Sequence, residues 1–275
     1  MAAMQSQTAE IYEGYLSDRR RTQIWKFVAL LAFLVFAVWS IDVLKIPIER
    51  VLGMFGPLGR MVSERLMPPD LAYVAQPKIL RSIVETIGMS VLGSLVGILI
   101  VMPLAWFAAW NVSPARFILY PLARIIIVIA RGVPTLMWAM LLVAIFGFGP
   151  LAGTLALMKA TIGFAGKLMA EQIEAIDMNR VDAIRATGAN EVFVFFYGVL
   201  PQVWASWVGI IIYNWDAQFR GSTILGFVGA GGLGLYLREQ LSILEYHTAM
   251  GVITVVIVLV ILSETISHHL RHRLY

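Results

Sequence analysis

Long runs of apolar residues, separated by short polar stretches, dominate the chain from about residue 25 onward. A helix needs about 20 mostly apolar residues to cross the hydrocarbon core of a bilayer. The pattern therefore predicts about six transmembrane helices, at residues 25–44, 83–110, 117–148, 152–177, 200–220 and 246–267. The expected fold is an all-α integral membrane protein.

Two of these runs carry a second signal. Three basic residues, Arg19 to Arg21, precede the first run, as they would in a signal peptide. No small-residue cleavage site follows that run, so a retained anchor is expected. The third run contains the stretch Arg-Gly-Val-Pro, from Arg131 to Pro134. This stretch could mark a kink, a re-entrant corner or a boundary between two short helices.

The composition supports a membrane protein and excludes a soluble domain. Hydrophobic residues make up 59% of the 275 residues and charged residues only 14%, with a mean hydropathy of +0.80. A soluble domain of this size could not hide so much apolar surface. The chain has no cysteine, which excludes a disulfide scaffold and a thiolate metal site. The formal net charge of +4 is modest, so its placement is more informative than its size.

The basic residues of the short connections predict the orientation of the spans, because such residues concentrate on the cytoplasmic side. With six spans, one side collects Arg19, Arg20, Arg21, Lys26, Arg116, Arg180, Arg185, Arg271 and Arg273. Both termini are therefore expected in the cytoplasm.

The connection at residues 45–81 disagrees with this assignment. It should lie outside the cytoplasm, yet it contains Lys45, Arg50, Arg60, Arg65, Lys78 and Arg81. An amphipathic segment lying at the membrane interface is favoured over an anion-collecting surface. Its apolar helical face would consist of Ile48, Val51, Leu52 and Phe55.

A polar element at residues 178–200 separates the fourth and fifth runs, and its pattern predicts two short helices joined by a turn. The first helix has small residues, Ala183 and Ala186, and Ala189 follows, so this helix could lie close against another surface. Gly188 tolerates the left-handed conformation that often ends a helix.

The second short helix is apolar, with a face made of Val192, Phe193, Phe195 and Phe196. The pair Leu200-Pro201 then starts the next span, where the missing N–H of proline does least harm. From the residues alone, two interpretations remain open. The element docks on another protein, or it packs its phenylalanines back onto its own bundle.

The spacing of Asp182-Ala183, Gly188 and Leu200-Pro201 resembles the EAA loop of ABC importer permeases. Asp182 replaces the Glu of that pattern, and Ile184 replaces its second Ala. The resemblance implies a coupling helix that sits in a groove of a cytoplasmic ATPase. The residues that it assigns to this coupling are Asp182, Ala183, Arg185, Ala186, Gly188, Ala189, Leu200 and Pro201.

Three further stretches are similar to the phosphonate-type permeases, which are relatives of the methionine importers. They are residues 161–177, 131–134 and 225–234, and the whole resemblance covers about residues 80–270. It implies a homodimer, two cytoplasmic ABC ATPase subunits and an extracytoplasmic binding protein that delivers the substrate. ATP and Mg²⁺ are expected in the ATPase partner, and no cofactor is expected in this chain.

A glycine-rich stretch follows the fifth run and contains Gly229, Gly231, Gly232 and Gly234. No strand precedes it, so it is not a nucleotide-binding fingerprint. It is expected to form a flexible segment on the outer side of the membrane.

Charged residues within spans are costly and usually face a bundle interior or an aqueous path. Lys159, Lys167 and Glu171 follow a helical i, i+4 ladder with Gly163, so they share one face. Lys167 and Glu171 are expected to pair, with Glu174 able to reach the same face. Lys159 has no acidic residue one turn away, so it could extend to the interface or face an anion in the pathway.

A second group of pathway candidates lies near the end of the fifth run. Asp216 and Arg220 are spaced for an ion pair. Alternatively, irregular backbone at Gly221-Ser222-Thr223 would let Arg220, Ser222 and Thr223 contact a phosphonate. Arg131, next to the break at Pro134, likewise could form an ion pair or contact the phosphonate. The candidate pathway residues are therefore Lys159, Lys167, Arg220, Ser222, Thr223 and Arg131.

The predicted function is the permease subunit of an ATP-driven importer for phosphonate or a related small phosphorus oxyanion, in a bacterial inner membrane. The subunit is expected to be non-catalytic and to bind no nucleic acid. A permease for methionine or another small solute, or a secondary transporter, is the alternative. A membrane-embedded metalloenzyme is disfavoured, because His247, His268, His269 and His272 lack the HExxH spacing, so no metal site is expected.

The predicted domain organisation has five parts. They are a cytoplasmic segment at 1–24, an anchor at 25–44, an extracytoplasmic connection at 45–81, a permease domain at 82–270 that includes the coupling loop at 178–200, and a cytoplasmic tail at 271–275.

Overall fold

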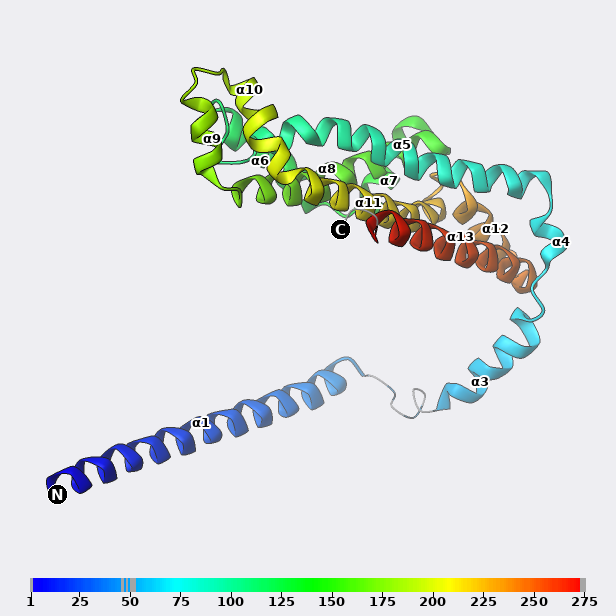
Figure 1. The fold of residues 1–275 in the computed structure, drawn as a ribbon. Helices are drawn as coiled ribbons and strands as arrows, with labels where there is room; N and C mark the ends of the chain where they lie inside the picture. The colour runs from blue at the N-terminus through cyan, green and yellow to red at the C-terminus, as the bar shows by residue number, and fades with distance from the viewer. Residues whose placement is uncertain (1, 46, 48, 50–52, 273–275) are drawn as a thin grey trace. The chain divides into compact units, whose positions relative to one another are not determined.

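A computed structural model describes residues 2–45, 47, 49 and 53–272 (Figure 1). In this part of the chain every regular element is a helix, as the sequence predicts. The chain divides into two compact units, Met1–Met61 and Val62–Tyr275. Three residues of the predicted interfacial face, Ile48, Val51 and Leu52, lie outside the described residues.

The first unit contains the long helix α1 (Ala2–Val43) and the short helix α3 (Phe55–Arg60). The predicted boundary between a cytoplasmic segment and an anchor, at residues 24 and 25, lies inside α1. Thr22–Val43 is long and apolar enough to cross a membrane, and none of its side chains is buried. A helix that is apolar on all sides is typical of a membrane span.

The second unit contains the other helices. They are α4 (Leu71–Val74), α5 (Pro77–Phe107), α6 (Leu119–Gly132), α7 (Thr135–Phe146), α8 (Pro150–Glu174), α9 (Met178–Arg185), α10 (Glu191–Val194), α11 (Leu200–Leu225), α12 (Leu233–Ser242) and α13 (Tyr246–His272). One π-helical turn, Met61–Leu66, includes the last residue of the first unit and the first five of the second. Another, Phe195–Val199, joins α10 to α11. The sequence did not predict α4 or α12.

The predicted count of six spans is not confirmed in full. By length and composition, four helical segments of the described chain could cross a membrane: Thr22–Val43, Pro77–Phe107, Glu191–Val228 and Tyr246–Arg271. The pair α6 and α7 would be a fifth span if it counts as one. α8 has 25 residues but is not among these segments, and it carries four charged side chains, Lys159, Lys167, Glu171 and Glu174.

The break at Pro134 is a boundary between two helices. α6 ends at Gly132, α7 begins at Thr135, and the two helices are bent by 89°. Val133 has an extended backbone, with φ of −106° and ψ of 126°. Proline disfavours the helical conformation in the residue before it, which explains why α6 stops here.

α8 lies at the centre of the second unit and packs against α5, α6, α7 and α11 (Figure 1). Glycines allow this close packing. A Cβ atom on Gly97 of α5 would lie 2.6 Å from the Cβ atom of Thr161 in α8. A Cβ atom on Gly163 of α8 would lie 2.9 Å from the carbonyl carbon of Ala130 in α6. Small residues at helix contacts are typical of membrane bundles, where they let backbones approach.

One buried hydrogen bond ties α12 to α5. The backbone N–H of Leu233, in the first turn of α12, donates to the Thr86 hydroxyl over 2.9 Å, and both residues are fully buried. Thr86→Val keeps the side-chain shape but leaves this N–H without an acceptor, which costs about 1–3 kcal/mol.

We expect Thr86→Val to lower the midpoint of thermal unfolding of the purified protein in detergent. The matched control is Thr154→Val, because the Thr154 hydroxyl is exposed and donates only to the Pro150 carbonyl of its own helix. Equal midpoints for the two variants would contradict this prediction.

Candidate functional site

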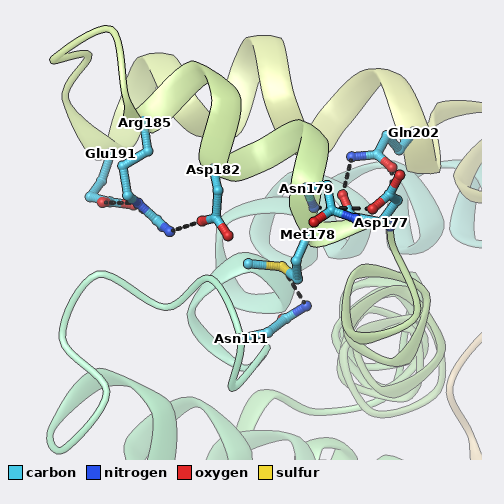
Figure 2. Close-up of polar contacts among 8 residues, drawn as sticks. All are labelled: Asn111, Asp177, Met178, Asn179, Asp182, Arg185, Glu191 and Gln202. Atoms are coloured by element: carbon cyan, nitrogen blue, oxygen red, sulfur yellow. Dashed lines mark hydrogen bonds and ion pairs between the residues drawn. The ribbon is translucent and has the colours of Figure 1, made fainter.

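The polar element between the fourth and fifth predicted spans begins with α9, which is anchored at its amino-terminal end (Figure 2). The Asp177 carboxylate accepts the backbone N–H of Asn179 over 3.0 Å and caps the helix. Gln202 of α11 accepts the N–H of Asp177 over 3.2 Å and donates to the Asp177 carbonyl over 3.3 Å. The start of α9 is therefore fixed to the first turn of α11.

Arg185 connects the end of α9 to the start of α10 (Figure 2). Its guanidinium donates to Asp182 over 3.0 Å and, through two nitrogens, to the two oxygens of Glu191 over 3.0 and 3.1 Å. The hydrogen bond with Glu191 is the main cause of a raised pKa for Arg185. Arg185 thus holds the turn by a bidentate ion pair, and Asp182 is joined to the same network.

α9 has a buried face and an exposed face. Val181 is fully buried, and Gly198 lies so close that a Cβ atom there would be 3.4 Å from Val181 Cα. Ala183 and Ala186 are exposed on the other side. Gly188 has φ of +81°, the left-handed conformation that the sequence analysis expected at the end of this helix. The small residues are therefore open to another surface.

The second short helix is a single turn, α10, that continues through the π-helical turn into α11. Phe195 is buried and stacks on Trp106, with ring centroids 4.7 Å apart. Phe193 and Phe196 remain more than half exposed. Both interpretations of the phenylalanines hold in part, since one packs on the bundle and two face outward.

Two residues that the sequence analysis did not assign form hydrogen bonds where α8 ends and α9 begins. Asn111 donates to the Ile173 carbonyl over 3.0 Å and to the sulfur of Met178 over 3.5 Å. Arg124 of α6 pairs with Glu174 of α8 over 2.5 Å. Glu174 thus pairs with a residue of α6 and not with Lys167 of its own helix. An arginine inside a predicted span was the signal that could have identified Arg124.

The predicted pair on α8 is confirmed, with Lys167 Nζ 3.3 Å from Glu171 Oε1. Lys159 extends toward the break between α6 and α7. Its ammonium donates to the Val133 carbonyl and lies 5.6 Å from the centroid of the Trp138 ring. Lys159 therefore contacts the break between α6 and α7 and is partly exposed there.

A cavity of about 480 Å³ lies beside this break. Its polar lining comes from Arg131 of α6, Lys159 of α8, Gln218 of α11 and Thr135 of α7, and the rest is mostly apolar. Two of the predicted pathway residues, Arg131 and Lys159, are thus brought together. None of the described residues that line the cavity is a carboxylate, so the arrangement suits an anion.

The structure does not bring Arg220, Ser222 and Thr223 to this cavity. Arg220 pairs with Asp216 over 2.6 Å, and Asp216 also accepts from Ser263 of α13 over 3.0 Å. The predicted ion pair is therefore confirmed, and the alternative of irregular backbone at 221–223 is wrong, because α11 continues to Leu225. The Ser222 and Thr223 hydroxyls donate to carbonyls of their own helix. These residues therefore stabilise α11 and its contact with α13.

The glycine-rich stretch is buried and close-packed rather than open to solvent, and its position on the outer side of the membrane stays a prediction. Gly229, Gly231 and Gly232 have positive φ angles of 88°, 83° and 72°. Gly234 lies in α12, where a Cβ atom would be 2.0 Å from the Thr223 carbonyl oxygen. Each glycine therefore meets a conformational or packing requirement.

Comparison with known proteins identifies the family. Residues 101–274 match the family described as binding-protein-dependent transport system inner membrane component. The chain belongs to this family. It is a multi-pass component of an ABC transport system in the inner membrane, and the sequence-based recognition of an ABC importer permease is confirmed.

Two relatives of this permease are named for the transport of phosphite and of phosphate. The chain is 32% identical over 249 residues to the phosphite transport system permease protein PtxC of Stutzerimonas stutzeri, covering 90% of this chain and 88% of that protein. It is 36% identical over 228 residues to the phosphate-import permease protein PhnE of Mycolicibacterium smegmatis, covering 83% of this chain and 42% of that protein.

The fold is also that of a solved ABC permease. The permease chain in an inward-facing structure of the MetNI methionine ABC transporter matches with a TM-score of 0.61 and 20% identity. The match covers 72% of this permease and 96% of that chain. This likeness supports the type I importer fold that the sequence predicted, and it says nothing about substrate.

Proposed function

We propose that this permease carries a small phosphorus oxyanion, such as phosphite, phosphate or a phosphonate, across the inner membrane. The observation that carries the proposal is the agreement between relatives named for phosphite and for phosphate over most of this chain. A cavity with Arg131 and Lys159 and no carboxylate in its described lining fits an anionic substrate. Methionine is the second candidate, and it has only a fold likeness in its favour.

The proposal includes the partners that the family implies. Two copies of this chain would bind two cytoplasmic ATPase subunits, and an extracytoplasmic binding protein would deliver the substrate. The chain would be non-catalytic, with ATP and Mg²⁺ bound by the ATPase and with both of its own termini in the cytoplasm. Membership of a binding-protein-dependent family removes the alternative of a secondary transporter.

We assign the contact with the ATPase to the exposed face of α9. Ala183 and Ala186 offer a flat, small-residue surface, and Asp182 offers a carboxylate that is 62% exposed. Arg185 and Gly188 shape the turn behind that surface, and Ala189 packs against the core. Leu200 and Pro201 begin α11 and transmit movement of α9 to it.

Substrate-stimulated ATP hydrolysis by the complete transporter tests the proposed function. The complex would be purified through a tag on this chain, reconstituted in lipid with its binding protein, and assayed for ATP hydrolysis with phosphite, phosphate, methylphosphonate or methionine. We expect stimulation by at least one phosphorus oxyanion and none by methionine. Stimulation by methionine alone would overturn the substrate class and keep the architecture. The absence of any ATPase in the purified complex would overturn the proposed coupling.

A further inference from the structure

Four cationic side chains lie along the contact between α6 and α8. α8 contributes Lys159 and Lys167, and α6 contributes Arg124 and Arg131. The two helices run antiparallel, because Arg131 lies against Gly163 whereas Arg124 pairs with Glu174 at the far end of α8. Along the contact, the cations therefore alternate between the helices in the order Lys159, Arg131, Lys167, Arg124.

Two cavities follow this row of cations. The 480 Å³ cavity contains Arg131 and Lys159, as described above. A second cavity, of about 360 Å³, is lined by Arg124, Ile127, Val128, Arg131, Gly132 and Lys167. Arg131 lines both cavities, so its side chain lies between them. None of the described residues that line either cavity is acidic.

The charges of the row are neutralised unequally. Lys167 pairs with Glu171, Arg124 pairs with Glu174, and Lys159 donates to a backbone carbonyl. In the described part of the chain, no carboxylate lies within ion-pair distance of Arg131, which is an exposed residue and lines both cavities. A charge in an apolar bundle is costly unless it is paired or serves a ligand. Simple structural pairing explains Lys167 and Arg124, but it does not explain Arg131.

We propose that Arg131 is the transfer residue of a two-cavity path for the substrate oxyanion. The anion would first bind between Lys159 and Arg131, and the guanidinium would then pass it to the cavity of Lys167 and Arg124. Lys159 and Lys167 are eight residues apart on α8, which corresponds to about 12 Å along a helix. A long guanidinium side chain with a bidentate fork for phosphoryl oxygens can serve both cavities. This inference rests on the proposed function and adds the residues that select and move the anion.

The first test measures anion attraction without requiring transport. Because the chain has no cysteine, a single introduced cysteine is its only thiol. Ala160→Cys would report on the first cavity and Val128→Cys on the second. Each full transporter complex would be treated with an anionic sulfonate or a cationic trimethylammonium methanethiosulfonate reagent. For each variant, the rate of cysteine modification by the anionic reagent would be divided by the rate with the cationic reagent. This ratio would be normalised to that of Ser242→Cys, an exposed position that lines neither cavity.

We expect the anionic reagent to be favoured by about tenfold at both cavity positions, since a cleft lined by one sign of charge concentrates counter-ions. Adding Arg131→Gln should reduce this preference at both positions, because Arg131 lines both cavities. Millimolar phosphate or phosphite should slow the reaction in each cavity. No anion preference at either position, or a preference that survives Arg131→Gln, would overturn the inference.

The second test measures transport in proteoliposomes that contain the ATPase and the binding protein. Arg131→Gln should lower phosphite or phosphate uptake by at least about tenfold, with ATP hydrolysis stimulated by the loaded binding protein staying within about twofold. Arg131→Lys, which keeps the charge, should recover part of the uptake. The control Arg81→Gln removes a charge whose side chain is 84% exposed and should transport normally.

The outcomes separate this inference from the proposed function. If the unmodified transporter moves no phosphorus oxyanion, the proposed function fails, whatever the cysteine experiment gives. If it does move one and Arg131→Gln transports as well as Arg81→Gln, the inference fails and the proposed function stands. If uptake and ATP hydrolysis fall together and Arg131→Lys recovers neither, Arg131 has a structural role and the inference also fails.

Discussion

Replacing Gly188 by proline is expected to abolish ATP-driven uptake while the chain remains folded. Gly188 has φ of +81°, whereas the ring of proline holds φ near −65°. Proline also removes the hydrogen bond from the Gly188 N–H to the Arg185 carbonyl, which is 3.1 Å long. No other side chain or backbone atom lies within 4 Å of a Cβ atom built at this position, so the damage is confined to the turn.

The measurement compares uptake with ATP hydrolysis in the reconstituted complex. We expect uptake to fall by at least about tenfold, because a Pro substitution in an incompatible conformation displaces the turn that Arg185 holds. Gly188→Asn is the matched control, because asparagine tolerates the left-handed conformation. It should retain most of the uptake. Full uptake by the proline variant would show that the turn after α9 is not part of the coupling.

Replacing Gly234 by alanine is expected to destabilise the second unit strongly. The added Cβ atom would lie 2.0 Å from the Thr223 carbonyl oxygen and 2.9 Å from Gly226 Cα. Both contacts are to backbone, so no side-chain rotation relieves them. Overpacking of a core commonly costs about 1–3 kcal/mol of stability. We expect the cost of this clash to lie at or above the upper end of that range, because backbone atoms cannot move aside as side chains can.

The expected result is a fall in the thermal midpoint on the order of 10 °C, with loss of monodisperse protein in detergent. The matched control is Gly88→Ala in α5, where a Cβ atom meets nothing within 4 Å. Alanine there should be neutral or stabilise by up to about 1 kcal/mol, because it favours the helix over glycine. If the two variants had equal midpoints, the close packing of α12 on the end of α11 would be contradicted.

Several features of this protein were predicted from residues alone because they depend on local chemistry. Apolar run length predicted the helices α1, α5, α11 and α13, because the bilayer requires that length. The left-handed glycine after α9 and the pair of Lys167 with Glu171 follow from short-range preferences. The motif around α9 identified the family, since it lies within about 20 residues of sequence.

Other features were missed or predicted wrongly because they depend on contacts between distant segments. Glu174 pairs with Arg124, which is 50 residues away, rather than with a residue of its own helix. The glycines at 229–234 looked like a flexible segment, and only the approach of α12 to α11 explains their small size. α12 is short and amphipathic, so it gave no signal of membrane-span length.

The sequence by itself determined that this is a helical membrane permease of the ABC importer family, because span length, turn chemistry and a contiguous motif are properties of neighbouring residues. The tertiary structure decided which of the six candidate pathway residues lie together, and their role in a pathway stays a prediction. Arg131 and Lys159 share a cavity, whereas Arg220 is paired with Asp216, next to Ser263 of α13. Spacing along one helix predicts its faces, but which neighbouring helix covers each face depends on packing across the whole bundle.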